Sequence, residues 1–431
     1  MDLQGGGMFP ANLQALCMHQ INGFDHLRLG ARMEQEAELG PARIYVERSY
    51  FFADTVYVGA DSDKSVLPWL KQVGLAPGEV IEIPHACLFQ GLKESAPHFA
   101  DLQKRVKAGG RPFFFRTTAL EEQLIGRLGI DWRNTLSCDP DIAEKLADKA
   151  YIRRAAVEAG EDKIFPPHIA LSADWRPEQI EAAVWKIERN AKALGMREVV
   201  VKRTDLASGD GFCVWTSGGR YEFCQANQGH ELIVEAWINP HVPISNQWLI
   251  FNGEARYVGT SRQLQQGFVH KGNVIASDDR AVDFRISERL RHMTRPILAH
   301  AIKKGYNGII GFDAVYHVAS DRLWLTEANA RVTAGTYAYA LASRLNFKPW
   351  AVACKIIEPK AELLDFDGVI SALEYLPYRI DRPSGIVPYM LSGLRLPQGQ
   401  RRLGIMAVAD YPDSAEHFLN EAEKRLGALA G

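Results

Sequence analysis

The 431-residue sequence has few of the features that mark membrane, secreted or nucleic-acid-binding proteins. No uninterrupted apolar run approaches the about 20 residues that a membrane-spanning helix needs. The N-terminal segment MDLQGGGMFP lacks the charged-then-apolar layout of a secretory signal peptide. A formal net charge of −2 gives no reason to expect binding to nucleic acid or to an anionic membrane surface. We therefore expect a cytoplasmic protein whose partners are small molecules.

Two kinds of reactive motif are also missing. The six cysteines are scattered along the chain and form no C-x-x-C pair, so we expect reduced thiols. The phosphate-loop motif G-x-x-x-x-G-K-[ST] is absent, which excludes a P-loop nucleotide site. No constellation of residues marks a covalent nucleophile. Any catalysis must therefore depend on positioning and fixed charge.

The length and composition predict a globular protein of two to three domains. Hydrophobic residues make up 47% of the chain and charged residues 24%. In the first part of the chain, strand-like runs at 43–48, 55–58, 80–83 and 111–116 alternate with helical stretches. Such alternation favours an α/β fold with a parallel sheet. We predict an α/β (α+β) protein with domains at 1–136, 137–358 and 359–431.

The stretch 308–331, GIIGFDAVYHVASDRLWLTEANAR, contains the strongest functional pattern. Two apolar runs flank a short polar break and indicate a β-hairpin. A turn centred on Ser320 opposes 317 to 323, 315 to 325, and Asp313 to Glu327. Because strand side chains alternate, Asn329 and Arg331 project from the same face as Glu327. Val315 and Leu325 beside the acids favour partial burial.

Two facing acids repel each other, so a cation is expected between them. Mg²⁺ prefers oxygen ligands and typically takes one or two carboxylates while phosphates supply the rest. Asn329 adds a neutral oxygen, and Arg331 adds a charged fork for phosphate or carboxylate. The alternative is a solvated hairpin whose acids face water, because a slip of one residue in register would separate them.

Upstream segments contain further candidate positions. Asp139 and Pro140 begin a predicted helix that runs through Lys149. A strand at 198–203 carries Lys202 near its end, and a glycine-containing loop follows. Without other signals, a helical lysine is a solvated charge and the loop an ordinary hairpin tip. Arg116, which ends an aromatic strand, fits a ligand site or a structural role at the domain boundary equally well.

An Asp on one strand followed by Glu-x-Asn-x-Arg on the next resembles the metal-binding signature of ATP-grasp enzymes. The resemblance implies that Asp313, Glu327 and Asn329 hold Mg²⁺, or Mn²⁺ in its place, against the phosphates of ATP. It also implies that Arg331 holds an acyl phosphate or its carboxylate precursor. Arg262, which ends a predicted hairpin, is a second candidate for contact with phosphate or the substrate carboxylate.

The same resemblance implies a nucleotide site in the lobe 137–235, opposite a metal-binding lobe at 236–358. Lys149 and Lys202 match the lysines that contact ATP. The loop formed by Ser208, Gly209, Asp210 and Gly211 matches the loop that folds over the phosphates. In the segment ELIVEAWI, Glu235, Trp237 and Ile238 match the hinge whose main chain reads the adenine edge. The ribose contact is not predicted.

The resemblance implies an ATP-dependent carboxylate–amine ligase that forms an amide or peptide bond through an acyl phosphate and releases ADP. With an N-terminal pre-ATP-grasp domain and a small C-terminal cap, the chain resembles the peptide ligase of pheganomycin biosynthesis most closely. That match implies an amino acid or small peptide substrate in natural-product biosynthesis, and a homodimer is common among relatives. Two alternatives are an ATP-dependent phosphotransferase and a non-catalytic nucleotide-binding regulatory protein.

Overall fold

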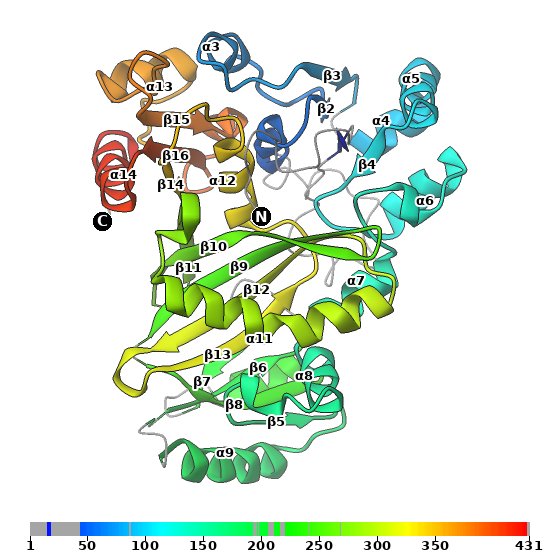
Figure 1. Ribbon diagram of the computed structural model, residues 1–431, viewed down its shortest axis with the longest axis vertical. Helices are drawn as coiled ribbons and strands as arrows, with labels where there is room; N and C mark the ends of the chain where they lie inside the picture. Colours follow the sequence, from blue (N-terminus) through cyan, green and yellow to red (C-terminus); the bar gives the residue numbers. More distant parts are fainter. Residues whose placement is uncertain are drawn as a thin grey trace.

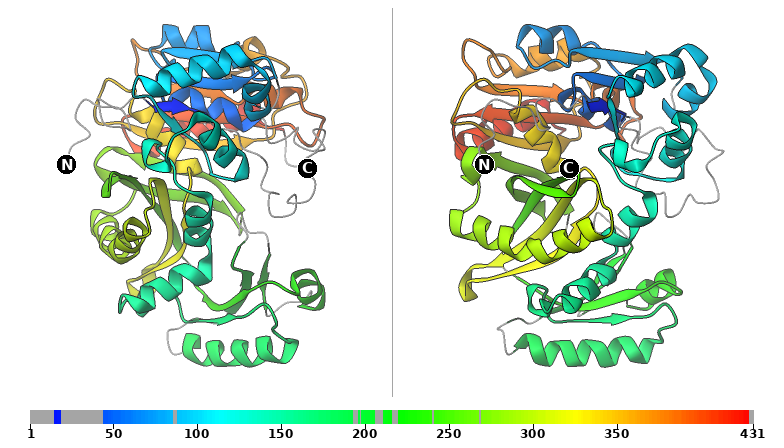
Figure 2. Two further views of the ribbon diagram at one scale, coloured as in Figure 1. Left: turned by 90° about the vertical axis from the view of Figure 1, so that its right-hand side faces the viewer. Right: turned by 45° about the vertical axis from the view of Figure 1, so that its right-hand side comes forward.

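Three β-sheets organise the protein (Figure 1). The computed structural model describes residues 15–18, 44–85, 88–192, 196, 198–205, 211–215, 220–239, 241–267 and 269–428. A four-stranded sheet with helix α9 lies at one end of the molecule, and the eight-stranded sheet runs from the middle to the other end (Figures 1 and 2). The first and last segments of the chain meet at the other end. No helix in this described part is long and apolar enough to cross a membrane.

The N-terminal sheet is parallel throughout, in the order β3-β2-β1-β4, as the alternation of strands and helices predicts. Its strands are β1 (Ala15–Cys17), β2 (Thr55–Gly59), β3 (Glu79–Ile83) and β4 (Arg111–Phe113). The helical elements are η2 (Ile44–Phe51), α3 (Leu67–Gln72), α4 (Leu88–Glu94), α5 (Ala96–Lys107), α6 (Ala119–Leu128) and η3 (Trp132–Asn134). The strand predicted at 43–48 is wrong, because η2 occupies that stretch and buries its aromatic side chains in a core shared with later elements.

The four-stranded sheet that packs with α9 is antiparallel, in the order β5-β8-β6-β7. Its elements, with the helices around it, are α7 (Pro140–Ala147), α8 (Lys149–Glu158), η4 (Asp162–Ile164), β5 (His168–Leu171), α9 (Pro177–Lys192), β6 (Glu198–Arg203), β7 (Phe212–Val214), α10 (Arg220–Asn227) and β8 (Leu232–Trp237). The apolar face of α9 packs on the sheet, as its periodicity predicts.

The helix predicted to continue from Asp139 past Lys149 is in fact two helices. Asp148 has an extended backbone and ends α7, and its Oδ1 then accepts a hydrogen bond at 2.6 Å from the N–H of Tyr151. Asp148 is therefore the N-cap of a second helix, α8. The break places Lys149 in the first turn of α8, where its buried side chain faces the interior.

The eight-stranded sheet is antiparallel, in the order β13-β12-β9-β10-β11-β14-β16-β15. Its first part contains β9 (Val242–Phe251), β10 (Glu254–Gln266), β11 (Val269–Ala276), η5 (Ser277–Asp279), α11 (Phe284–Lys303), β12 (Gly308–His317), η6 (Val318–Ser320), β13 (Arg322–Asn329), α12 (Ala334–Ala342) and β14 (Ala351–Ile357). Asn252 and Gly253, both with positive φ, form the turn between β9 and β10 that the Asn-Gly pair predicts. Helix α11 covers one face of this part (Figure 1).

The C-terminal segment completes the same sheet. It contains α13 (Phe366–Leu373), β15 (Gly385–Tyr389), η7 (Leu391–Arg395), β16 (Leu403–Ala409) and α14 (Pro412–Leu426). Strand β16 pairs with β14 along its whole length, so the sheet continues across the predicted boundary at 358/359. The domain boundaries themselves stay a prediction.

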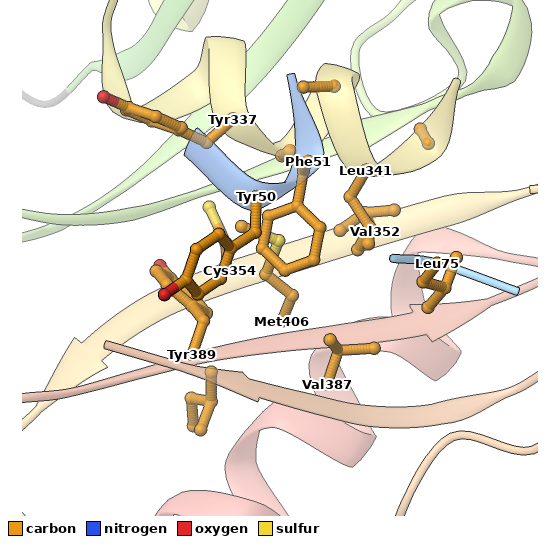
Figure 3. Packing of buried hydrophobic residues seen from close by; sticks show 14 of the residues in the cluster. Tyr50, Phe51, Leu75, Tyr337, Leu341, Val352, Cys354, Val387, Tyr389 and Met406 are labelled. Atoms are coloured by element: carbon orange, nitrogen blue, oxygen red, sulfur yellow. The ribbon is translucent and has the colours of Figure 1, made fainter. Parts of the chain in front are cut away.

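The N-terminal segment and the C-terminal strands share one hydrophobic core with α12. Figure 3 shows Tyr50 and Phe51 of η2 packed between α12 and the strands that carry Val352 and Met406. The Phe51 and Tyr389 rings meet edge to face at 6.1 Å. This core fixes the end of the N-terminal sheet against the eight-stranded sheet.

Candidate active site

The predicted pairing of Asp313 with Glu327 is confirmed, although the path to it differs from the expected one. Near the turn the register is one residue off the prediction, so His317 pairs with Arg322 and Val315 with Trp324. Thr326 is an extra residue that forms a β-bulge, and after it Glu327 pairs with Asp313 as predicted. The Thr326 hydroxyl donates to the Asp313 carbonyl oxygen at 3.1 Å. Bulges of this kind redirect side chains and often lie beside active sites.

The bulge also decides which apolar residues lie beside the acids. Trp324, rather than the expected Leu325, shares the face of Val315, and both pack in a cluster that includes Ile238 and Ala236. Leu325 lies in the core beneath α11 instead. The hairpin face that carries the acids therefore packs against the antiparallel sheet β5-β8-β6-β7. This sheet belongs to the predicted nucleotide lobe.

The two acids share hydrogen-bond donors. The Asn329 amide nitrogen donates to Asp313 Oδ2 at 3.0 Å and to Glu327 Oε1 at 3.5 Å, and the Gln263 amide donates to Asp313 Oδ1 at 3.0 Å. Burial, together with the nearby charge of Glu327, raises the pKa of the Asp313 carboxyl to about 7. Burial also disfavours the charged form of Glu327, but Lys149 and Lys202 outweigh it and lower the pKa of Glu327.

The opposing lobe contributes a buried group of charges, which we call the nucleotide-lobe cluster: Lys202, Arg153 and Glu235. Arg153 donates to Glu235 Oε2 at 2.5 Å, and Lys202 is bonded to the other carboxylate oxygen. Arg153 also donates to the Thr326 carbonyl at 3.2 Å and so reaches the bulge of the hairpin. Lys149 completes the approach, with its Nζ 3.3 Å from Glu327 Oε2.

Burial and the charges of neighbouring residues shift two pKa values in the nucleotide-lobe cluster. Burial, aided by Arg153 and Lys149, lowers the pKa of Lys202 in spite of the opposing charge of Glu235. Burial alone would raise the pKa of Glu235, but the charges of Lys202 and Arg153 lower it. The structure therefore brings Lys149, Lys202 and Glu235 to one place, and there the Glu235 side chain acts as a counter-ion.

The predicted hinge joins the two sheets. Strand β8 ends at Trp237, and Ile238 and Asn239 lead toward β9 of the eight-stranded sheet. The Trp237 ring contacts the Phe212 ring at 5.5 Å, and Ile238 is buried between the lobes. Gly211, with φ +62°, begins the return strand after Lys202, while Ser208, Gly209 and Asp210 lie outside the described residues.

The two predicted arginines have different positions. Arg331 donates to the Asn329 amide oxygen at 2.9 Å and so belongs to the acid group. Arg262 does not. Its register partner is Ile244, whereas Asp313 pairs with Ser245, so Arg262 lies on the opposite face of the sheet and forms an ion pair with Glu416. Residues 262–272, where no strand was predicted after Arg262, are part of the β10–β11 hairpin.

Two residues near the acids were not among the predicted site positions. Gln263 follows Arg262, and strand alternation alone points it to the other face, toward Asp313. Arg153 lies four residues after Lys149, a spacing that places two side chains on one face of a helix. Both spacings are present in the sequence. They identify these residues only when the register of the strand and the first residue of the helix are known.

The residues fit a magnesium–nucleotide complex. Two carboxylates and an amide offer the oxygen ligands that Mg²⁺ prefers. Burial and the nearby charge of Glu327 raise the pKa of Asp313, and a cation between the two acids would offset their repulsion. The Asn329 oxygen, which would bind the metal, accepts from Arg331 in this structure. Lys149 and Lys202 approach from the facing lobe, where phosphates would lie.

Solved structures with the same arrangement are ATP-binding proteins of low sequence identity. N5-carboxyaminoimidazole ribonucleotide synthase from Aspergillus clavatus, complexed with ATP, is 13% identical, with a TM-score of 0.54 over 96% of this chain and 98% of that one. Biotin carboxylase from Campylobacter jejuni, in a β-γ-ATP complex, is 14% identical, with a TM-score of 0.55 over 96% and 92%. No protein-family model and no curated protein sequence matches the chain. These likenesses, with a parallel N-terminal sheet and two antiparallel sheets, confirm the predicted fold: the chain has the ATP-grasp fold.

Proposed function

We propose that the protein is an ATP-dependent carboxylate–amine ligase that works through an acyl phosphate. The observation that carries the proposal is the opposed pair Asp313 and Glu327, with Lys149 and Lys202 reaching it from the facing lobe. This arrangement suits a triphosphate with a divalent cation beneath it. The similar structures that hold ATP or ADP support the same placement of the nucleotide.

Each residue has a distinct role in the proposed reaction. Asp313, Glu327 and Asn329 would hold Mg²⁺, which neutralises phosphate charge when bound. Lys149 and Lys202 orient the phosphates of ATP, and Glu235 keeps Lys202 in place through their ion pair. Arg331 holds the substrate carboxylate in line with the γ-phosphorus. Attack forms the acyl phosphate and releases ADP.

An amine then attacks the acyl carbon, which gives an amide and inorganic phosphate. A loop at 208–211 that folds over the site, as the resemblance implies, would limit hydrolysis of the acyl phosphate by restricting the access of water. We propose an amino acid or small peptide as substrate. The comparisons support the fold and give no support for the closer resemblance to the pheganomycin peptide ligase, so natural-product biosynthesis stays a prediction. The glycine loop at 208–211, the cytoplasmic location and a homodimer also stay predictions.

A screen of amino acids and small peptides for Mg²⁺-dependent ADP release tests the reaction class. The expected result is ADP release that requires both an acid and an amine, and capture of the acyl phosphate as a hydroxamate when hydroxylamine replaces the amine. Turnover without an amine, with a stable phosphate ester as product, would instead identify a phosphotransferase. Nucleotide binding without any turnover would identify a regulatory module.

A further inference from the structure

A pocket lies where the N-terminal sheet meets the strand segment that carries Arg331. Its volume is about 220 Å³. The lining residues are 113–117, 136–138, 306–309 and 330–332. Two of them, Arg116 and Arg331, are cations, and none is acidic. Two guanidinium groups and no carboxylate line this pocket, and this lining suits an anion.

A backbone hydrogen bond fixes the two arginines beside each other. The N–H of Val332 donates to the carbonyl oxygen of Phe115 at 3.0 Å. Arg331 and Arg116 immediately flank the two bonded residues, one on each segment. The Arg331 guanidinium also lies 5.9 Å from the centre of the Phe115 ring. The juxtaposition therefore depends on the main chain as well as on side-chain rotamers.

Neither arginine forms an ion pair with a carboxylate within the described ranges, although Glu327 and Asp313 lie near Arg331 and Glu121 lies near Arg116. Arg331 donates only to neutral oxygens, those of the Asn329 amide and the Val332 carbonyl. Arg116 forms no ion pair with any residue that the structure describes. The acid nearest in sequence, Glu121, is buried and caps its own helix by accepting from the N–H of Thr118 at 2.8 Å. Burial raises the pKa of Glu121 to about 7, so it supplies only part of a negative charge at neutral pH.

Two like charges held together in a pocket without acids indicate a site for an anion of matching charge. We propose that Arg116 and Arg331 form a two-arginine site that holds the small carboxylate substrate and, after phosphoryl transfer, its dianionic acyl phosphate. This inference rests on the proposed function and adds a residue from the N-terminal domain to it. Arginine suits the task because its planar fork donates two parallel hydrogen bonds to an oxyanion.

The charge balance of the reaction explains why two arginines are useful. A carboxylate oxygen forms a bond to the γ-phosphorus, and the bond from that phosphorus to the β-γ bridging oxygen breaks, so its electron pair leaves with ADP. The group in the pocket changes from a monoanion to a dianion. Two guanidinium groups match the dianion better than one, so Arg116 stabilises the intermediate more than the substrate. Amine attack then breaks the acyl C–O bond, and phosphate leaves while the amine proton passes to solvent.

Binding of acetonylphosphonate tests the site without any turnover. In this probe a methylene replaces the bridging oxygen of acetyl phosphate, so the dianion is stable. Calorimetry would compare the wild-type protein with R116Q, R116K and the control R133Q. Arg133 is a suitable control because its side chain is 88% exposed and pairs with Asp131 outside the pocket. Thermal unfolding of each variant would check that the fold is intact.

We expect R116Q to weaken probe binding by about 10- to 100-fold, R116K to lose less, and R133Q to bind as the wild type does. Probe affinity within twofold of the wild type in folded R116Q would overturn the site. So would a wild-type protein that does not bind the probe. Mg–ADP binding, measured in the same samples, reports on the proposed function separately: its absence from the wild type would overturn that function, whereas normal binding alongside a probe failure would leave it standing.

Discussion

The nucleotide-lobe cluster and the hairpin acids are both buried and charged, yet their charges are balanced differently. In the cluster, Glu235 accepts from Lys202 and Arg153, so opposite charges neutralise one another within the protein. On the hairpin, Asp313 and Glu327 are like charges on neighbouring strands, and Lys149 forms an ion pair with Glu327. Burial is costly for a charge unless a partner offsets it.

The difference separates residues that build the site from residues that await a ligand. The nucleotide-lobe cluster holds the Lys202 ammonium in position through Glu235, and its two cations against one carboxylate leave positive charge for a phosphate. The acid pair and the two arginines of the pocket have fewer direct partners of opposite charge, so a ligand of matching charge should stabilise them further. Residues of the first kind should therefore matter for stability, and those of the second kind for binding and turnover.

The largest expected effect is on stability, in Glu235→Ala. This change leaves Lys202 and Arg153 buried without an anion, so we expect a loss of about 3–5 kcal/mol in the free energy of unfolding. Urea denaturation measures it. The control is Glu231→Ala, whose partner Arg154 is 3.9 Å away and exposed, and it should cost less than about 0.5 kcal/mol. Equal losses in the two variants would contradict the distinction.

The next effect is on turnover, in Asp313→Ala. We expect Mg²⁺-dependent ADP release to fall by about 10²- to 10³-fold while the circular dichroism spectrum stays that of the wild type. Asp321→Ala is the matched control, because Asp321 lies at the tip of the same hairpin with its side chain 75% exposed. Normal ADP release by a folded Asp313→Ala protein would remove the acid pair from the metal site.

A smaller effect is expected on nucleotide affinity, in Lys202→Ala. Loss of a buried ammonium beside the phosphates should weaken Mg–ATP binding by about 10- to 100-fold, measured by calorimetry. Lys186→Ala changes an exposed lysine on α9 and should leave the affinity unchanged. Unchanged affinity in Lys202→Ala would show that this lysine serves only as a partner of Glu235.

The smallest effect concerns pH, in Asp313→Asn without Mg²⁺. The pKa of Asp313 in the folded protein is about 7, above that in the unfolded chain, so folded-state stability decreases as pH rises toward and through 7. The Asn variant cannot ionise and avoids that loss. We expect it to be more stable than the wild type, by a margin that grows by about 1 kcal/mol between pH 6 and pH 7 in urea titrations. A margin that does not change with pH would show that the pKa of Asp313 is not raised in the folded protein.

Local patterns predicted much of the fold and the pairing of the two acids. Alternation predicted the parallel N-terminal sheet, periodicity predicted α9, and the Asn-Gly pair predicted the turn from β9 to β10. The pairing of Asp313 with Glu327 was also predicted correctly, although the register nearer the turn and the bulge at Thr326 were not. Such features depend on neighbours in sequence, so the sequence contains their signal.

The sequence by itself determined which residue types were available: acids, lysines and arginines on strands or helices whose periods place them on defined faces. Only the tertiary structure decided their partners. It turned Arg262 toward Glu416, brought Arg153 to Glu235, and joined Phe115 to Val332 so that Arg116 lies beside Arg331. The physical reason is that partners far apart in the chain are chosen by packing, register and charge balance across whole sheets, and no single segment encodes these.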